Sequence, residues 1–209
     1  METMSELVEE HVLCVPRFAF DAAGAFEGAS LDIDRYVRLL QTVNLVYVPR
    51  AAAETDPTYK QLIPYIIVRT TDNRVLRYQR GTGGGETRLH GRYSIGIGGH
   101  IASTDQVDLG QLDYRTALRR ELQEEIGHVV VLHECAVAVI NDESTAVGQV
   151  HLGMVHIVTV ENPDAVVAEL GAVTNPEFVS IPALMTNLEL YENWSQICLT
   201  HLSAMLAAA

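Results

Sequence analysis

The sequence predicts an α/β fold of the mixed α+β kind, in which helices cover both faces of one mixed sheet. Three observations lead to this prediction. Long β-branched runs typical of strands occupy residues 129–140 and 150–160, and helical patterns occupy residues 114–126 and 188–206. These elements are intermixed without the regular strand–helix–strand order of a parallel sheet. With 209 residues and no repeat or linker, residues 1–209 are expected to form one domain, with residues 1–60 packed on it as an N-terminal extension.

The first sixty residues contain two expected strands and one expected helix. Residues 12–15 and 45–48 are short apolar runs, which predict strands. Between them, residues 31–43 carry apolar side chains at helical spacing, and Ser30 is a suitable N-cap. Residues 51–59 show neither period and are expected to form a loop.

A β-hairpin and a glycine-rich connector are expected next. Residues 64–68 and 75–78 are strand-like and flank the turn-forming residues 71–73. Residues 81–86 resemble a phosphate-binding loop, but they lack the Gly-Lys-Ser/Thr ending and the following helix that such a loop requires. We therefore expect a flexible connector there.

The central helix follows a strand and a long loop. Residues 93–97 predict a strand, and residues 101–111 predict the loop. Asp113 is a good N-cap for a helix over residues 114–126. Gly127 ends that helix, because glycine enters the left-handed conformation without steric cost.

Three strands and a closing helix complete the expected fold. The β-branched runs 129–140 and 150–160 flank the polar residues 141–145, and residues 178–181 form a short strand. Residues 188–206 are amphipathic and predict a helix that packs on the core.

The composition excludes several classes of partner. A net charge of −13, from 14 basic and 27 acidic residues, argues against nonspecific binding to nucleic acid or to anionic lipid. No apolar run approaches the ~20 residues that span a membrane, and the acidic N-terminus does not resemble a signal peptide. Cys14, Cys135 and Cys198 are too scattered for a disulfide framework. A cytoplasmic protein is expected, and a homodimer is left open.

The most informative segment is residues 120–127, which read Arg-Glu-Leu-Gln-Glu-Glu-Ile-Gly. Glu121, Glu124 and Glu125 share one helix face, because residues three and four apart are neighbours on a helix. Two of them fall in the last helical turn, where the helix dipole disfavours carboxylates. A bound hard cation such as Mg²⁺ or Mn²⁺ would reverse that penalty. A solvated acidic face is the alternative.

Together with Gly98 and Gly99, this segment resembles the signature of Nudix hydrolases. The resemblance covers residues 98–128, and three departures stand out. Seven residues are inserted between Gly99 and the Arg-Glu segment, Leu112 stands where the family has its early glutamate, and His128 replaces an apolar residue.

The resemblance implies an α/β/α Nudix fold and hydrolysis of a small molecule that consists of a nucleoside diphosphate linked to a further group. It implies that Glu121, Glu124 and Glu125 hold Mg²⁺ or Mn²⁺ and that Glu124 and Glu125 are catalytic. The carbonyl of Gly99 is a further candidate ligand, because a Gly-Gly bend allows close approach.

Other candidate residues surround this motif. Arg120 is placed to hold the carboxylates, since it lies four residues before Glu124. A general base from a loop outside the signature is a feature of many Nudix-like enzymes, and Glu143 is the candidate here. Arg80, Arg88 and Arg92 are candidates for gripping phosphate with their planar forks.

Several roles are left open. His100 and His151 can touch metal or substrate, or can be structural. Asp105 and Asp108 in the inserted loop can compensate for the missing glutamate, or the loop can merely tolerate its length. A protein that binds nucleotides as a sensor with weak or no catalysis is the main alternative function. A prenyl diphosphate isomerase is a further one, although no cysteine adjoins the signature.

Overall fold

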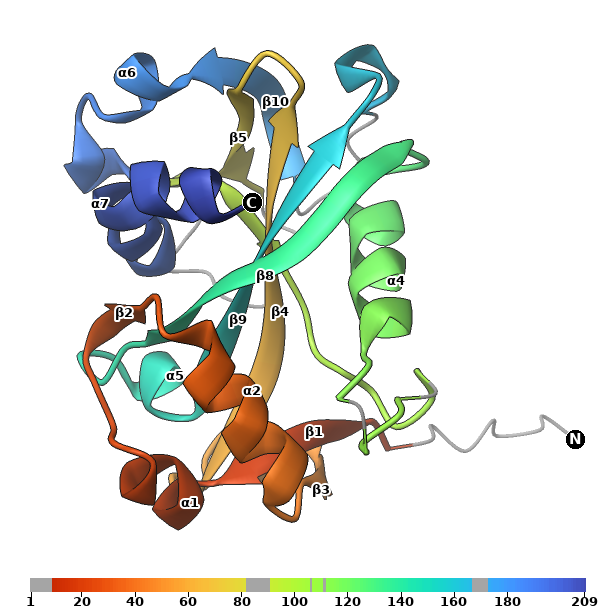
Figure 1. Cartoon of the computed structure of the whole chain (residues 1–209), viewed down its shortest axis with the longest axis vertical. Helices are drawn as coiled ribbons and strands as arrows, with labels where there is room; N and C mark the ends of the chain where they lie inside the picture. The colour runs from red at the N-terminus through yellow and green to blue at the C-terminus, as the bar shows by residue number, and fades with distance from the viewer. Residues whose placement is uncertain (1–8, 82–90, 106, 111, 167–172) are drawn as a thin grey trace, which may run out of the picture.

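The computed structural model describes residues 9–81, 91–105, 107–110, 112–166 and 173–209. Within these residues, one sheet forms the centre of the molecule (Figure 1). Its strands are β1 (His11–Pro16), β2 (Gly28–Ser30), β3 (Val46–Pro49), β4 (Tyr59–Thr70), β5 (Arg74–Arg80), β6 (Tyr93–Ser94), β7 (Gly96–Gly98), β8 (Val131–Asn141), β9 (His151–Val160) and β10 (Val173–Ser180). The helices are α1 (Arg17–Ala22), α2 (Ile33–Thr42), α3 (Arg50–Ala53), α4 (Arg115–Ile126), α5 (Ala146–Gln149), α6 (Ile181–Leu184) and α7 (Asn193–Ala208), with 3₁₀ turns at Pro163–Ala165 and Leu188–Leu190.

The sheet is mixed, as the sequence predicts. Its main path runs β10-β5-β4-β9-β8-β2, and the β4–β9 pair is parallel while the other pairs are antiparallel. β1 joins the sheet through β4 and β3, so the described part of the first sixty residues is hydrogen-bonded to the rest.

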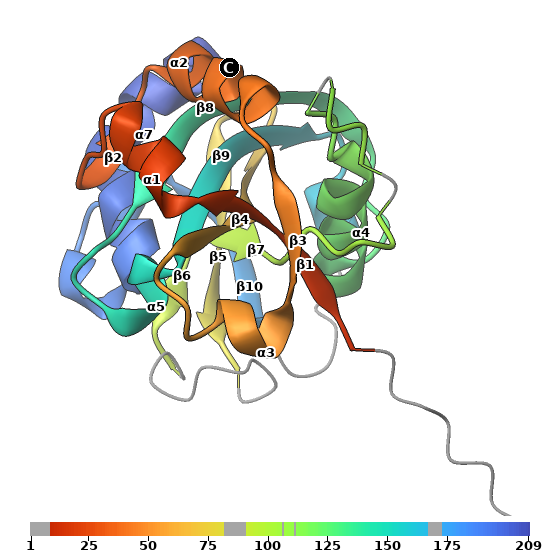
Figure 2. The same ribbon diagram turned by 90° about the horizontal axis from the view of Figure 1, so that it is seen from below.

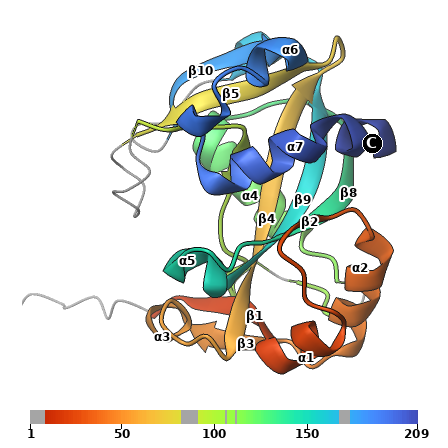
Figure 3. The ribbon, with the colours of Figure 1, turned by 90° about the vertical axis from the view of Figure 1, so that its left-hand side faces the viewer.

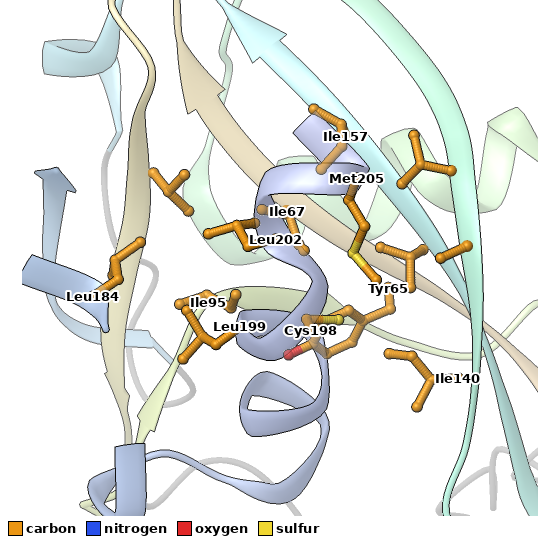
Figure 4. Close-up of a cluster of buried hydrophobic side chains, with 14 of the residues drawn as sticks. Tyr65, Ile67, Ile95, Ile140, Ile157, Leu184, Cys198, Leu199, Leu202 and Met205 are labelled. Carbon is orange, nitrogen blue, oxygen red and sulfur yellow. The ribbon is translucent and has the colours of Figure 1, made fainter. Parts of the chain in front are cut away.

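Helices lie on both faces of the sheet, with α7 on one side and α4 on the other (Figures 1 and 3). The alternation of side chains along β4 divides the core between them. Tyr65 and Ile67 point into the cluster under α7, which Figure 4 shows, and Ile66 and Val68 point into the cluster under α4. The predicted arrangement of helices around a mixed sheet is therefore confirmed.

Several expected elements differ in detail. The helix predicted at residues 31–43 is α2, and its N-cap is Asp32, whose carboxylate accepts from the backbone N–H of Arg35 at 3.4 Å. Ser30 lies two residues earlier, opposite Val139 in the β2–β8 ladder, and its hydroxyl accepts from the N–H of Asp32 at 3.4 Å. The loop expected at residues 51–59 begins inside α3, whose run of three alanines has high helix propensity.

Two further predictions were partly wrong. The strand expected at residues 93–97 is divided into β6 and β7, because the backbone N–H of Ile95 donates to Ser195 Oγ at 2.9 Å instead of to a strand. The cap of α4 is Tyr114, although the Asp113 carboxylate does accept from the N–H of Arg115 at 3.1 Å. The connector expected at residues 81–86 lies almost entirely outside the described residues.

Candidate active site

A cavity of about 900 Å³ lies where α3, α4, α5 and the start of α7 approach the end of β7. Figure 2 views the molecule from below and shows α3, α4 and α5 around β7. Segments far apart in the sequence supply its wall, which includes Glu54, Tyr65, Arg80, Arg92, Gly98, Gly99, His100, Arg120, Glu121, Glu124, Glu125, Asp142, His151, Glu192 and Trp194. The cavity therefore brings most of the predicted site residues together.

The α4 glutamates meet the Gly-Gly bend at this cavity. Glu121 is buried, and its carboxylate occupies the space that a Cβ atom on Gly99 would fill. A Cβ on Gly98 would instead meet Ile63 Cγ2 at 3.3 Å, a tight contact, and the carbonyl oxygen of Pro64 and Tyr65 Cδ2 at 3.5 Å. Any side chain at position 99 would therefore collide with Glu121, and the backbone of Gly99 lies directly against the Glu121 carboxylate.

Arg120 is held by three acidic partners and one backbone carbonyl. Its Nε donates to Asp105 Oδ1 and its Nη2 to Asp105 Oδ2, both at 2.8 Å. Nη1 donates to Glu121 Oε1 at 2.7 Å and to Glu124 Oε2 at 3.1 Å, and Nη2 also donates to the carbonyl of His100 at 2.9 Å. These contacts fix the guanidinium between the inserted loop and α4.

The inserted loop therefore reaches the site through one of its two acidic residues. Asp105 is only 4% exposed, and Arg120 and the N–H of Ala102 hold its pKa below the usual value in spite of its burial. Asp108 is exposed and accepts from the N–H of Gly110 instead. Leu112, at the position of the missing glutamate, is buried in an apolar cluster.

The electrostatics of the cluster favour a cation. Burial raises the pKa of Glu121, Arg120 opposes this rise, and the charges of Glu124 and Glu125 add to it. Glu121, Glu124 and Glu125 line the same cavity as Gly99, and carboxylate and backbone carbonyl oxygens are the ligands that a hard divalent ion prefers. The residues present thus fit Mg²⁺ or Mn²⁺.

Two of the three predicted arginines line the cavity. Burial lowers the pKa of Arg80, but Tyr78, Glu192, Tyr65 and Glu125 together raise it, so its guanidinium stays charged. Arg92 donates from Nη1 to the carbonyls of Glu189 and Tyr191 at 3.1 and 3.3 Å, which anchors it beside α7. Arg88 lies outside the described residues.

Glu143 is not brought together with the α4 glutamates. Its carboxylate pairs with the buried Lys60 at 2.9 Å and with Arg17 at 3.1 Å, and it is not among the residues that line the cavity. Lys60 and Arg17 outweigh the effect of burial and lower its pKa. The preceding residue, Asp142, lines the cavity in its place.

Sequence reasoning missed several cavity residues. Glu54 follows α3, in a segment expected to be a loop, and no local pattern marks it. Glu192 caps α7 through the N–H groups of Trp194 and Ser195 and accepts from the Tyr65 hydroxyl at 2.8 Å. An acidic residue is favourable at a helix N-terminus, so Glu192 was a sequence signal for the start of the closing helix.

The fold and the carboxylate helix define a class of protein. A mixed sheet between helices, with an Arg-Glu-Leu-Gln-Glu-Glu helix facing a Gly-Gly bend, is the arrangement that the sequence resemblance implies, and the chain belongs to the Nudix hydrolase superfamily. No protein-family model matches the sequence. None of the described helices combines the length and apolar character needed to cross a membrane.

Particular relatives support this assignment. Protein YmaB of Bacillus subtilis (strain 168) is 30% identical over 158 residues, which cover 70% of this chain and 74% of YmaB. The crystal structure of Tm1382, described as a candidate Nudix hydrolase, superposes with a TM-score of 0.78 at 28% identity and covers 94% of this chain and all of its own. The NUDIX domain of Shewanella oneidensis NrtR in complex with ADP ribose shares the fold, with a TM-score of 0.50 at 16% identity over 71% of this chain and 87% of that domain.

Proposed function

We propose that this protein is a metal-dependent pyrophosphohydrolase that cleaves the diphosphate link of a nucleoside diphosphate joined to a further group. One observation carries the proposal. The buried Glu121 lies against Gly99 in a cavity that Glu124 and Glu125 also line, and Arg80 and Arg92 line the same cavity. Carboxylates for a cation and guanidinium groups for phosphate are the two elements that such a substrate requires.

The proposed ligands of the cation are Glu121, Glu124, Glu125 and the carbonyl of Gly99. When bound, a divalent cation clamps the non-bridging phosphate oxygens, spreads the developing charge and activates a water. The protein contributes the positions of the carboxylates. Arg120 acts as a positioning residue, since it spans Asp105 on the loop and both Glu121 and Glu124 on the helix.

The reaction is displacement by water at one phosphorus atom. A carboxylate of the cluster, Glu124 or Glu125, accepts the proton of the attacking water, and the phosphate on the far side of the bridging oxygen leaves. Arg80 and Arg92 neutralise the phosphate oxygens. Glu143 is an unsuitable base in this scheme, because Lys60 and Arg17 already pair with its carboxylate and stabilise its charged form.

A second function has one observation in its favour. Leu112 occupies the position of the early glutamate and is buried with a positive φ of 51°, so no carboxylate reaches the site from there. A protein that binds a nucleoside diphosphate derivative without hydrolysing it would need only the phosphate-binding part of the cavity.

A phosphate-release screen separates the two functions. Purified protein is incubated with a panel of nucleoside diphosphate derivatives and either Mg²⁺ or Mn²⁺, with product phosphate liberated by an added phosphatase. Glu125→Gln, prepared in the same way, controls for contaminating activity. Turnover by wild type that the variant lacks supports hydrolysis. Saturable binding of a panel member without turnover in either metal would favour the sensor instead.

A further inference from the structure

A second group of metal-ligating side chains lies in the same cavity, apart from the α4 glutamates. Glu54, His100 and His151 each offer one ligand atom, and these atoms all lie within 4.8 Å of one another. Nε2 of His100 is 3.9 Å from Oε1 of Glu54, and the two imidazole rings meet edge to face with centroids 5.6 Å apart. Among the described residues, this is the group of three histidine and carboxylate side chains whose ligand atoms lie close enough together to hold one ion.

His100 has the features of a ligand that lacks its ion. Its Nε2 atom is buried and has no hydrogen-bond partner among the described residues. Buried polar atoms are nearly always paired, so an unpaired one calls for an explanation. Glu54 does not satisfy this atom, because the 3.9 Å between His100 Nε2 and Glu54 Oε1 is longer than a hydrogen bond.

His151 is oriented by a partner outside the group. Its Nδ1 lies 2.7 Å from the carbonyl oxygen of Val147. Since a carbonyl only accepts, Nδ1 carries the hydrogen, and in the neutral ring Nε2 carries the lone pair. A histidine that donates one ring N–H to a backbone carbonyl is the usual arrangement of a metal ligand.

The three ligands come from well-defined elements that the fold holds together. Glu54 follows α3, His100 follows β7 and the Gly-Gly bend, and His151 begins β9. Ligand atoms that lie about 2.0–2.1 Å from a Zn²⁺ ion in tetrahedral geometry are about 3.4 Å apart. Side-chain rotations that move the ligand atoms by about 1 Å would therefore bring them to this spacing.

We propose that Glu54, His100 and His151 form a second metal site, which binds Zn²⁺ or a related transition metal in preference to Mg²⁺. Two imidazole nitrogens favour transition metals, whereas the all-oxygen α4 cluster suits Mg²⁺. Three protein ligands leave a fourth position for water or for a substrate oxygen, and all three residues line the cavity. The site does not depend on the proposed hydrolysis, because it is defined by its own residues.

Cobalt provides a direct test, since Co²⁺ follows the same ligand preferences and its visible absorption reports nitrogen coordination. The full chain is titrated with Co²⁺ in excess Mg²⁺, which occupies the α4 cluster. The expected result is a saturable visible band that Zn²⁺ displaces at one equivalent. His100→Ala and His151→Ala should each weaken Co²⁺ binding at least about 100-fold, since loss of an outer partner alone costs 10–100-fold.

Matched variants keep the test independent of folding and of the α4 cluster. Glu54→Gln removes a ligand whose side chain is partly exposed, so it tests the site even if the histidine variants do not fold. His133→Ala removes an exposed histidine from β8, near the end of β9 opposite to His151, and should leave the band unchanged. Glu125→Gln should also leave it unchanged. The absence of a nitrogen-coordinated band in wild type, or a wild-type Co²⁺ affinity in Glu54→Gln and both histidine variants, would overturn the proposal.

Discussion

The guanidinium of Arg120 is gripped by the carboxylate of Asp105 through two parallel hydrogen bonds of 2.8 Å, across fifteen residues of sequence. Bidentate pairs of this kind are stronger and more directional than single hydrogen bonds. The same guanidinium contacts Glu121 and Glu124. Asp105, from the loop that carries the insertion, is therefore linked through Arg120 to two glutamates that match the family signature.

We predict that Asp105→Asn lowers both stability and turnover, whereas Asp108→Asn changes neither. A hydrogen bond to a charged group contributes about 1.5–3 kcal/mol, and the amide replaces only one of the two acceptors. Chemical denaturation and steady-state kinetics measure the two effects. Asp108 serves as the control because it is exposed and accepts from the N–H of Gly110 within the same loop. Equal behaviour of the two variants would mean that the inserted loop has no role at the site.

The α4 glutamates should be essential for turnover. Glu124→Gln and Glu125→Gln are each expected to reduce the rate at least about 100-fold, the loss typical of removing one group that stabilises developing charge. The substrate is the best member of the phosphate-release panel, and EDTA in excess should abolish wild-type turnover. Full activity with EDTA, or near-normal rates in both variants, would rule out this assignment.

Gly99→Ala should be far more damaging than Gly98→Ala. A Cβ at Gly99 would displace the Glu121 carboxylate, whereas one at Gly98 finds its nearest neighbour, Ile63 Cγ2, at 3.3 Å. Misplacing a site group by about 1 Å can cost about 100-fold in rate, which is the loss expected for Gly99→Ala. Kinetics of the two alanine variants test this, and similar rates in both would show that the close approach is not needed for activity.

The stability of the metal-free protein should depend on the protonation of Glu121. Burial raises the pKa of Glu121 in the folded state, so its contribution is present below about pH 4.5, the usual value, and is lost as pH rises through the raised pKa. Glu121→Gln removes this dependence and should raise the melting temperature near neutral pH without metal.

With Mg²⁺, wild type should become more stable than the Glu121→Gln variant, because an ion that binds only the folded state stabilises it by mass action. Wild type is expected to gain melting temperature with Mg²⁺, while Glu121→Gln combined with Glu125→Gln should not respond. The stability that Asp105 contributes has the opposite pH dependence, because the pKa of Asp105 is lowered. Subtracting the stability-versus-pH curve of Glu121→Gln from that of wild type therefore isolates the contribution of Glu121. An undiminished Mg²⁺ response in the double variant would place the ion elsewhere.

Sequence patterns predicted the parts of the fold that depend on local regularity. β8 and β9 are long β-branched runs, and α4 has a helical period with a glycine stop, so all three lie close to their expected positions. The 3-residue β2 and the 4-residue α3 are too short for a period to be recognised, and their structure depends on partners such as β8.

The site was predictable where it lies within one helix and unpredictable where it crosses elements. The spacing of the α4 glutamates determines their common face, and the Gly-Gly bend indicated a close approach. The contact of Asp105 with Arg120 and the approach of Glu54 to His100 join separate segments, and no local pattern indicates such tertiary contacts. The pairing of Glu143 with the buried Lys60 is likewise a tertiary contact, because Lys60 comes from β4, far away in sequence.

The parallel pairing of β4 with β9 has a consequence for synthesis on the ribosome. Gln61 lies opposite His151 and Thr70 opposite Val160, so every partner in this ladder is 90 residues away along the chain. At a translation rate of 5–20 residues per second, β4 is complete roughly 5–18 s before its partner strand exists. During that interval the edge of β4 that pairs with β9 lacks its partner, and contacts of such long range also slow folding. Until β9 emerges, this unpaired edge of β4 is a surface on which other strands could pair.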